Sequence, residues 1–168
     1  AVRTSSYIRH HANITMCKAK ANGNYINSIL ALREAIDSGC EEALMLDNEG
    51  YVAEGSGENF FMVRDGVIYT PDLTSCLEGI TRDAIFQIAH DEGYEVREKR
   101  ITRDEVYICD EAFFTGTAAE VVPVRELDSR QIGAGGRGPI TEKLQSIYLQ
   151  AVRGEQARYR DWLTPVSN

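Results

Sequence analysis

The fold is decided by residues 43–70, ALMLDNEGYVAEGSGENFFMVRDGVIYT, in which short apolar segments are separated by turn sequences. Residues 43–46 and 51–53 flank Asp-Asn-Glu-Gly, and residues 59–63 and 67–70 flank Arg-Asp-Gly. An Asp-Gly pair between apolar segments is typical of a tight hairpin turn. Because strands joined so closely run antiparallel, we predict two hairpins in this stretch.

Helical patterns lie on both sides of these hairpins. Residues 24–38, 81–92 and 140–152 carry apolar side chains at helical spacing, and a Thr-x-x-Glu capping box begins a short helix over residues 102–106. Further strands are predicted over residues 2–8, 94–99, 111–114 and 121–127. Because strands and helices mix without strict alternation, we predict an α/β domain with a mixed sheet (α+β), not a Rossmann fold.

Length and composition indicate one globular domain. The chain has 168 residues, of which 43% are hydrophobic and 26% charged, enough for a stable apolar core. Its net charge of −8 would repel nucleic acid. No apolar run approaches the roughly 18 residues of a membrane span, and no signal-peptide pattern opens the sequence. We therefore expect a soluble protein that binds neither nucleic acid nor membrane.

The cysteines and histidines show no metal-binding pattern. The four cysteines form no CxxC pair and have no histidine at ligand spacing. A domain with an adequate core needs no disulfides, so reduced thiols and a cytoplasmic location are expected. We predict no metal site.

The segment KANGNY at residues 20–25 places a lysine just before the helix predicted over residues 24–38. The positive end of a helix dipole favours the neutral, nucleophilic form of a nearby amine. Tyr25 falls in the first helical turn, where its phenol can hydrogen-bond a neighbouring oxygen. Lys20 is therefore a candidate nucleophile, although Lys18 fits the same chemistry and a surface lysine before a helix explains the same pattern.

Three further segments combine glycine with polar side chains between predicted elements. Residues 54–59, EGSGEN, let the backbone approach a ligand and place Glu54 at the end of a strand, unless they form only an acidic turn. In residues 79–84, GITRDA, the amides of a helix N-terminus and the Thr81 hydroxyl make an anion site or a simple N-cap. Residues 115–120, TGTAAE, offer a second anion site or a tight turn.

Together these segments supply an amine, a carboxylate, a phenol and two anion sites. Pyridoxal phosphate needs such a set, because its aldehyde reacts with a lysine, its ring nitrogen pairs with an acid and its phosphate takes amide and hydroxyl donors. From residue chemistry alone, a pyridoxal phosphate enzyme is one of several possible functions.

Four motifs, in order and spacing, resemble the class IV (fold type IV) pyridoxal-phosphate aminotransferases, and most closely the branched-chain amino acid aminotransferases. They are KANGNY (20–25), EGSGEN (54–59), GITRDA (79–84) and FFTGTAAEVVPV (113–124). The resemblance runs almost from end to end. It implies that residues 1–168 form the large cofactor-binding domain of the D-amino acid aminotransferase-like fold, with the family's N-terminal small domain absent from this chain.

The resemblance also implies roles for individual residues. Lys20 would form a Schiff base with pyridoxal 5'-phosphate and act as the catalytic base, Tyr25 would bond the phenolic oxygen, and Glu54 would pair with the ring nitrogen. Thr117 would contact both phosphate and substrate, and the amide of Ala118 would hold the substrate carboxylate. The other implied cofactor-binding positions are Leu77, Gly79, Ile80, Thr81 and Gly116.

The implied reaction is reversible transfer of an amino group from leucine, isoleucine or valine to 2-oxoglutarate, carried out by a homo-oligomer. The alternatives are D-amino acid aminotransferase and aminodeoxychorismate lyase within the family, and a non-catalytic module outside it. The GNY and TGTAAE runs favour the branched-chain type.

Two features depart from the family pattern. Glu78 stands where family members usually have proline. The second departure is the missing small domain, which in these enzymes supplies a phosphate-binding arginine and much of the substrate pocket. We therefore expect the 168-residue chain by itself to bind the cofactor weakly and to be inactive.

Overall fold

A single mixed sheet of ten strands organises the computed structural model, which describes residues 1–166. The strands are β1 (Val2–Thr4), β2 (Glu42–Leu46), β3 (Val52–Gly55), β4 (Asn59–Arg64), β5 (Val67–Thr70), β6 (Val96–Glu98), β7 (Glu111–Gly116), β8 (Glu120–Pro123), β9 (Glu126–Leu127) and β10 (Arg130–Gln131). The helices are η1 (Asn22–Asn24), α1 (Tyr25–Asp37), α2 (Ile80–Asp91), α3 (Arg103–Tyr107), α4 (Pro139–Val152) and η2 (Ala157–Trp162).

Parallel and antiparallel pairs are combined in this sheet, as predicted. The strand order is β10-β9-β1-β2-β3-β4-β5-β6, and the β7–β8 hairpin joins it at β4. Strand β1 runs parallel to β2 and β9, and β5 runs parallel to β6, whereas the other pairs are antiparallel. Because β7 occupies one edge of β4, strands β3 and β5 share the other edge, and the sheet branches there.

Both predicted hairpins are confirmed. Strands β2 and β3 pair with Leu44 opposite Gly55, and β4 pairs with β5. The second turn has positive φ angles at Asp65 (50°) and Gly66 (76°). This backbone is the one that an Asp-Gly turn provides between twisted strands.

Three predicted strands are wrong in extent, and one of them, predicted over residues 94–99, is a strand only over Val96–Glu98. Residues 121–127 form two strands, β8 and β9, because the chain leaves β7 after Val124, whose N–H still donates to the carbonyl of Ala112, and then pairs with β1. Residues 2–8 are a strand only over Val2–Thr4. The capping box at Thr102 and Glu105 is present, and it begins α3 as expected.

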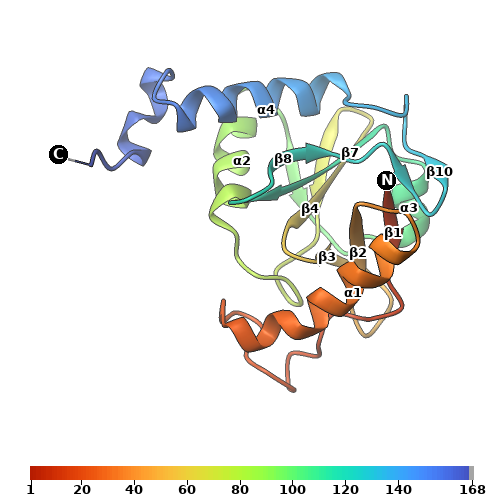
Figure 1. Ribbon diagram of the computed structural model, residues 1–168. Coiled ribbons are helices and arrows are strands. Elements are labelled where there is room, and N and C mark those ends of the chain that lie inside the picture. Colours follow the sequence, from red (N-terminus) through yellow and green to blue (C-terminus); the bar gives the residue numbers. More distant parts are fainter. Residues whose placement is uncertain (167–168) are drawn as a thin grey trace.

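Two helices cover one face of the sheet and place the site. Helices α2 and α4 pack on β4 and β7 through a core that includes Phe61, Phe113, Ile85 and Leu144. The rings of Phe61 and Phe113 stack with centroids 5.1 Å apart. In Figure 1, α4 crosses above the sheet with α2 beneath its C-terminal part, while α1 lies at the opposite end of the molecule.

Helix α1 packs its small side chains on the sheet and turns most of its large apolar side chains outward, although apolar spacing alone would place the large ones inside. Its small side chains, Ala31 and Ala35, are buried against Ala43 and Met45 of β2. Most of its large apolar side chains are exposed, and these are Ile26, Ile29, Leu30 and Ile36, whereas Leu32 is half-buried. Close packing on the sheet therefore leaves a row of isoleucine and leucine side chains at the surface.

The four cysteines are free thiols, and Cys17, Cys76 and Cys109 are buried. Within residues 1–166, no cluster of His, Cys, Asp or Glu has the composition of a metal site. None of the helices in the described part of the chain is both long and apolar enough to cross a membrane.

Candidate active site

A cavity of about 150 Å³ lies where the four segments singled out from the sequence meet. The segment before α1, the β3–β4 turn, the loop into α2 and the β7–β8 turn all contribute to its wall. The predicted site residues that line it are Lys20, Tyr25, Glu54, Leu77, Gly79, Ile80, Thr81, Gly116 and Thr117. Ala118, the remaining predicted residue, is exposed in the β7–β8 turn and does not line the cavity.

The two lysines that sequence chemistry could not separate occupy different places. Lys20 lines the cavity, and its Nζ donates a hydrogen bond of 2.8 Å to the phenolic oxygen of Tyr25. Lys18 instead donates to the backbone carbonyls of Leu73 and Cys76, in the loop that leads to α2. Lys20 is thus the lysine whose amine faces the cavity, while Lys18 ties two segments of the wall together.

Glu54 is held by an ion pair that the sequence did not predict. Its Oε1 lies 2.6 Å from Nε of Arg9, and each side chain is only 8% exposed. The other carboxylate oxygen accepts the backbone N–H of Leu77 at 3.1 Å and the amide N–H of Asn59 at 3.5 Å. Burial raises the pKa of the Glu54 carboxyl, and the charge of Arg9 opposes that rise. Arg9 therefore favours the ionised carboxylate.

Gly79 is required where the cavity wall meets α2. A Cβ atom at this position would lie 2.0 Å from Oδ1 of Asn59. The Asn59 amide is already engaged, because its Nδ2 donates to the carbonyl of Leu77 at 2.8 Å. Glycine lets the loop pass close to β4, and Asn59 then links this loop to Glu54.

Glu58 is a second titratable carboxyl in the wall, and the sequence prediction assigned it no role. The pKa of Glu58 is raised to about 7, mainly because the carboxyl is buried and secondly because the negative charge of Glu42 lies nearby. Glu42 accepts the backbone N–H of Ser56 at 3.1 Å, which places its carboxylate beside the same turn. Near pH 7, the Glu58 carboxyl at the edge of the cavity is therefore partly protonated.

The raised pKa of Glu58 predicts a pH-dependent stability. Since the folded chain holds this proton more tightly than the unfolded chain, the contribution to stability is fully present below about pH 4.5 and is lost as the pH rises through about 7. Glu58→Gln keeps a neutral group at every pH. We expect Glu58→Gln to raise Tm at pH 8 by roughly 2–4 °C and to change it little at pH 5, as measured by calorimetry. An equal shift at both pH values would contradict the assignment.

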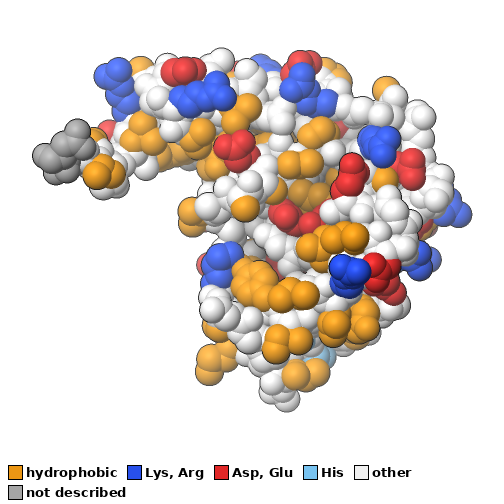
Figure 2. All heavy atoms as spheres, viewed as in Figure 1, with side chains coloured by type: hydrophobic (Ala, Val, Ile, Leu, Met, Phe, Trp, Pro, Cys, Tyr) orange, Lys and Arg blue, Asp and Glu red, His pale blue; other side chains and the backbone are white. Residues whose placement is uncertain are grey.

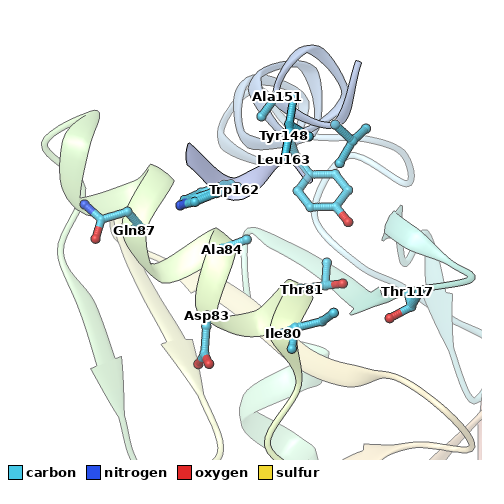
Figure 3. A pocket seen from close by; sticks show the side chains of 11 residues that line it. Ile80, Thr81, Asp83, Ala84, Gln87, Thr117, Tyr148, Ala151, Trp162 and Leu163 are labelled. Atoms are coloured by element: carbon cyan, nitrogen blue, oxygen red, sulfur yellow. The ribbon is translucent and has the colours of Figure 1, made fainter. Parts of the chain in front are cut away.

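A larger and more apolar cavity of about 570 Å³ adjoins the first one and shares Ile80, Thr81 and Thr117 with it. It lies between α2, α4 and η2. In Figure 3 the hydroxyls of Thr81 and Thr117 point into the space between them, and the phenol of Tyr148 is directed toward the same region. The titratable side chains Lys20, Glu54 and Glu58 line only the smaller cavity.

Comparison with known proteins places this arrangement in one family. Residues 1–127 match the family model described as amino-transferase class IV. The chain is 64% identical over 165 residues to a branched-chain-amino-acid aminotransferase of Pseudomonas aeruginosa, with 98% of this chain and 54% of the relative covered. It is 45% identical to the enzyme of that name from Escherichia coli, with 97% and 53% covered. The chain thus spans about half the length of the curated relatives it matches.

Two solved structures that this chain resembles are also branched-chain aminotransferases of about twice its length. The chain superposes with a TM-score of 0.95 and 49% identity on the branched-chain aminotransferase of the archaeon Thermoproteus uzoniensis with norvaline, covering 99% of this chain and 55% of that one. The branched-chain amino acid aminotransferase from Thermobaculum terrenum in its PLP form gives a TM-score of 0.97 at 44% identity, with 99% and 55% covered.

Proposed function

This chain belongs to the class IV aminotransferase family, and from that membership we propose that it forms the pyridoxal-phosphate-binding large domain of a branched-chain amino acid aminotransferase. The proposed substrates are leucine, isoleucine or valine with 2-oxoglutarate. The observation that carries the proposal is the convergence of Lys20, Glu54 and the N-terminus of α2 on one cavity. The relatives' names favour branched-chain substrates over the D-amino acid and lyase alternatives.

The residues of the cavity fit the cofactor. Lys20 offers an amine, and buried Glu54 offers an anion for a pyridinium nitrogen. Helix α2 begins at Ile80 after the N-cap residue Gly79, which has no side chain, so the amides of Ile80 and Thr81 can donate to a bound anion. Thr81 and Thr117 add hydroxyl donors for a phosphate. Each chemical part of pyridoxal phosphate therefore has a counterpart among the lining side chains and amides.

When bound, pyridoxal phosphate supplies an aldehyde that exchanges amines and a ring that withdraws electrons from the substrate Cα. In the proposed mechanism, Lys20 Nζ removes the proton from Cα of the amino acid, and its 2.8 Å hydrogen bond to Tyr25 orients that nitrogen. The positive charge of Arg9 opposes protonation of Glu54, whose carboxylate would pair with a protonated ring nitrogen. The amides at the start of α2 would donate to the phosphate and would so position the cofactor.

We also propose a homo-oligomer and a cytoplasmic location. The exposed row of Ile26, Ile29, Leu30 and Ile36 on α1 supports self-association, because isolated monomers rarely expose contiguous apolar surface. Figure 2 shows apolar side chains gathered over α1 and the loop before it. The free cysteines support a reducing compartment. Sedimentation velocity tests the first proposal, and a monomer at about 0.1 mM would contradict it.

Visible spectroscopy tests the proposed function. Titration of the chain with pyridoxal phosphate should produce an absorbance band that responds to pH and is lost on borohydride reduction. Addition of L-leucine to the full-length protein should convert this band, whereas D-alanine should not. The absence of any band at excess cofactor would favour the non-catalytic module.

A further inference from the structure

Strand β7 passes beneath the N-termini of two helices, and a side chain of β7 accepts hydrogen bonds from the first amides of only one of them. Glu111, at the start of β7, caps α4, because its carboxylate accepts the N–H of Ile140 at 3.0 Å and the N–H and hydroxyl of Thr141 at 2.7 and 2.6 Å. Helix α2 begins at Ile80 after the N-cap residue Gly79, which has no side chain, and within residues 1–166 no carboxylate accepts from its first amides as Glu111 does for α4. The first amides of α2 thus lack the anionic partner that α4 has.

The side chain of Thr115 lies on the β7 face that carries the capping carboxylate. Residues alternate along a strand, so Glu111, Phe113 and Thr115 share one face, and Phe113 packs in the core beneath α2 and α4. Thr115 lines the smaller cavity together with Ile80, Thr81 and Thr117. Its position therefore corresponds to that of Glu111, but under α2 instead of α4.

Thr115 also carries a hydroxyl that lacks a partner. The residue is 0% exposed, and its Oγ1 makes no hydrogen bond to any part of the chain that the structure describes. The buried Thr70 differs in this respect, because its hydroxyl donates to the carbonyl of Phe60 at 2.7 Å. A buried hydroxyl without a partner is unfavourable, so an anion bound beside it would gain a hydrogen bond and remove that cost.

From these three observations we propose that Thr115 is a further phosphate ligand, whose hydroxyl donates to an anion held by the first amides of α2. That the anion is the phosphate of pyridoxal phosphate rests on the proposed function. The hydroxyls of Thr81 and Thr117 and the first amides of α2 would hold the same anion, and the hydroxyl of Thr115 would add one further donor. A hydroxyl suits this place because an anion accepts hydrogen bonds and the helix dipole already supplies positive potential.

The test compares Thr115→Val, which removes the hydroxyl at constant shape, with Thr115→Ser, which keeps it. We expect Thr115→Val to weaken binding of pyridoxal phosphate by about tenfold or more, because a hydrogen bond to a charged group is lost. Binding of pyridoxal, which has no phosphate, should change less than about twofold. Thr115→Ser should bind both compounds like the wild type, and the ligand-free Thr115→Val chain should have an equal or higher Tm.

Thr70→Val is the matched control, because it deletes a buried hydroxyl that is already bonded to the protein. It should lower Tm without changing the preference for pyridoxal phosphate over pyridoxal. Thr115→Val that binds pyridoxal phosphate like the wild type, or that loses both ligands equally, overturns the assignment while leaving the proposed function intact. Should the wild type bind no pyridoxal phosphate, the proposed function fails. The role of Thr115 is then tested with inorganic phosphate, which should raise the Tm of the wild type more than the Tm of Thr115→Val. An equal rise in both would overturn that role.

Discussion

Lys20→Ala is expected to abolish both the visible band formed with pyridoxal phosphate and any transamination by the full-length protein. The amine of Lys20 faces the cavity beside Tyr25, and no other lysine among the described residues lines that cavity. The variant should still bind the cofactor through its phosphate, so absorbance and affinity are measured separately. Retained transamination at wild-type cofactor loading would exclude Lys20 as the nucleophile.

Lys18→Ala is the matched control for this experiment. Lys18 lies two residues away and bonds carbonyls of the loop before α2. Its loss should lower Tm, because those carbonyls lose a charged donor, but the visible band should remain. A pair of variants that both lose the band would show that the loop, rather than one amine, controls cofactor binding.

Glu54→Ala is expected to lower the free energy of unfolding by about 3–5 kcal/mol, because it leaves the Arg9 charge buried without its partner. The variant should also lose the visible band or hold the cofactor far more weakly. Urea denaturation followed by circular dichroism measures the first effect. A loss below about 1 kcal/mol would mean that water reaches Arg9 and that the pair is not buried in solution.

A double variant separates the stability of this pair from its function. Arg9→Met with Glu54→Leu removes both charges and fills the space with apolar groups, so most of the lost stability should return. Cofactor binding should not return, because the anionic partner of the ring nitrogen is still missing. Recovery of both properties would show that Glu54 has only a structural role.

The sequence predicted the elements of the fold whose signals are local. Asp65 and Gly66 specify their turn through backbone conformation, and Thr102 with Glu105 specifies a helix start through side-chain hydrogen bonds. The join between β9 and β1 could not be predicted, because it depends on a tertiary pairing between residues far apart in the chain. Strand β10 and the 3-10 helices are too short to produce a periodic pattern.

Helix α1 shows how tertiary packing overrides a local pattern. Apolar periodicity identified the helix correctly but suggested that its large side chains face the core. Close approach of α1 to β2 requires small residues, so Ala31 and Ala35 face the sheet and Ile29 faces outward. Residue size, read together with periodicity, is the signal that could have indicated this orientation.

At the site, motifs predicted the residues whose chemistry shows within a short run and missed those whose role depends on tertiary contacts. Lys20 and Tyr25 belong to one short run, and they do lie together. Arg9 reaches Glu54 from a separate segment, whereas Asn59 and Thr115 stand inside quoted motifs and are recognised only by a contact or by burial without a partner. Such residues follow from the pairing of strands and the packing of loops, which no single motif contains.

Borohydride reduction of the wild-type chain in the presence of pyridoxal phosphate, followed by mass spectrometry of the modified peptide, identifies the lysine that reacts with the cofactor. We expect one phosphopyridoxyl group, fixed to Lys20. Modification of Lys18 instead, or labelling spread over the surface lysines without a preferred site, would contradict this expectation.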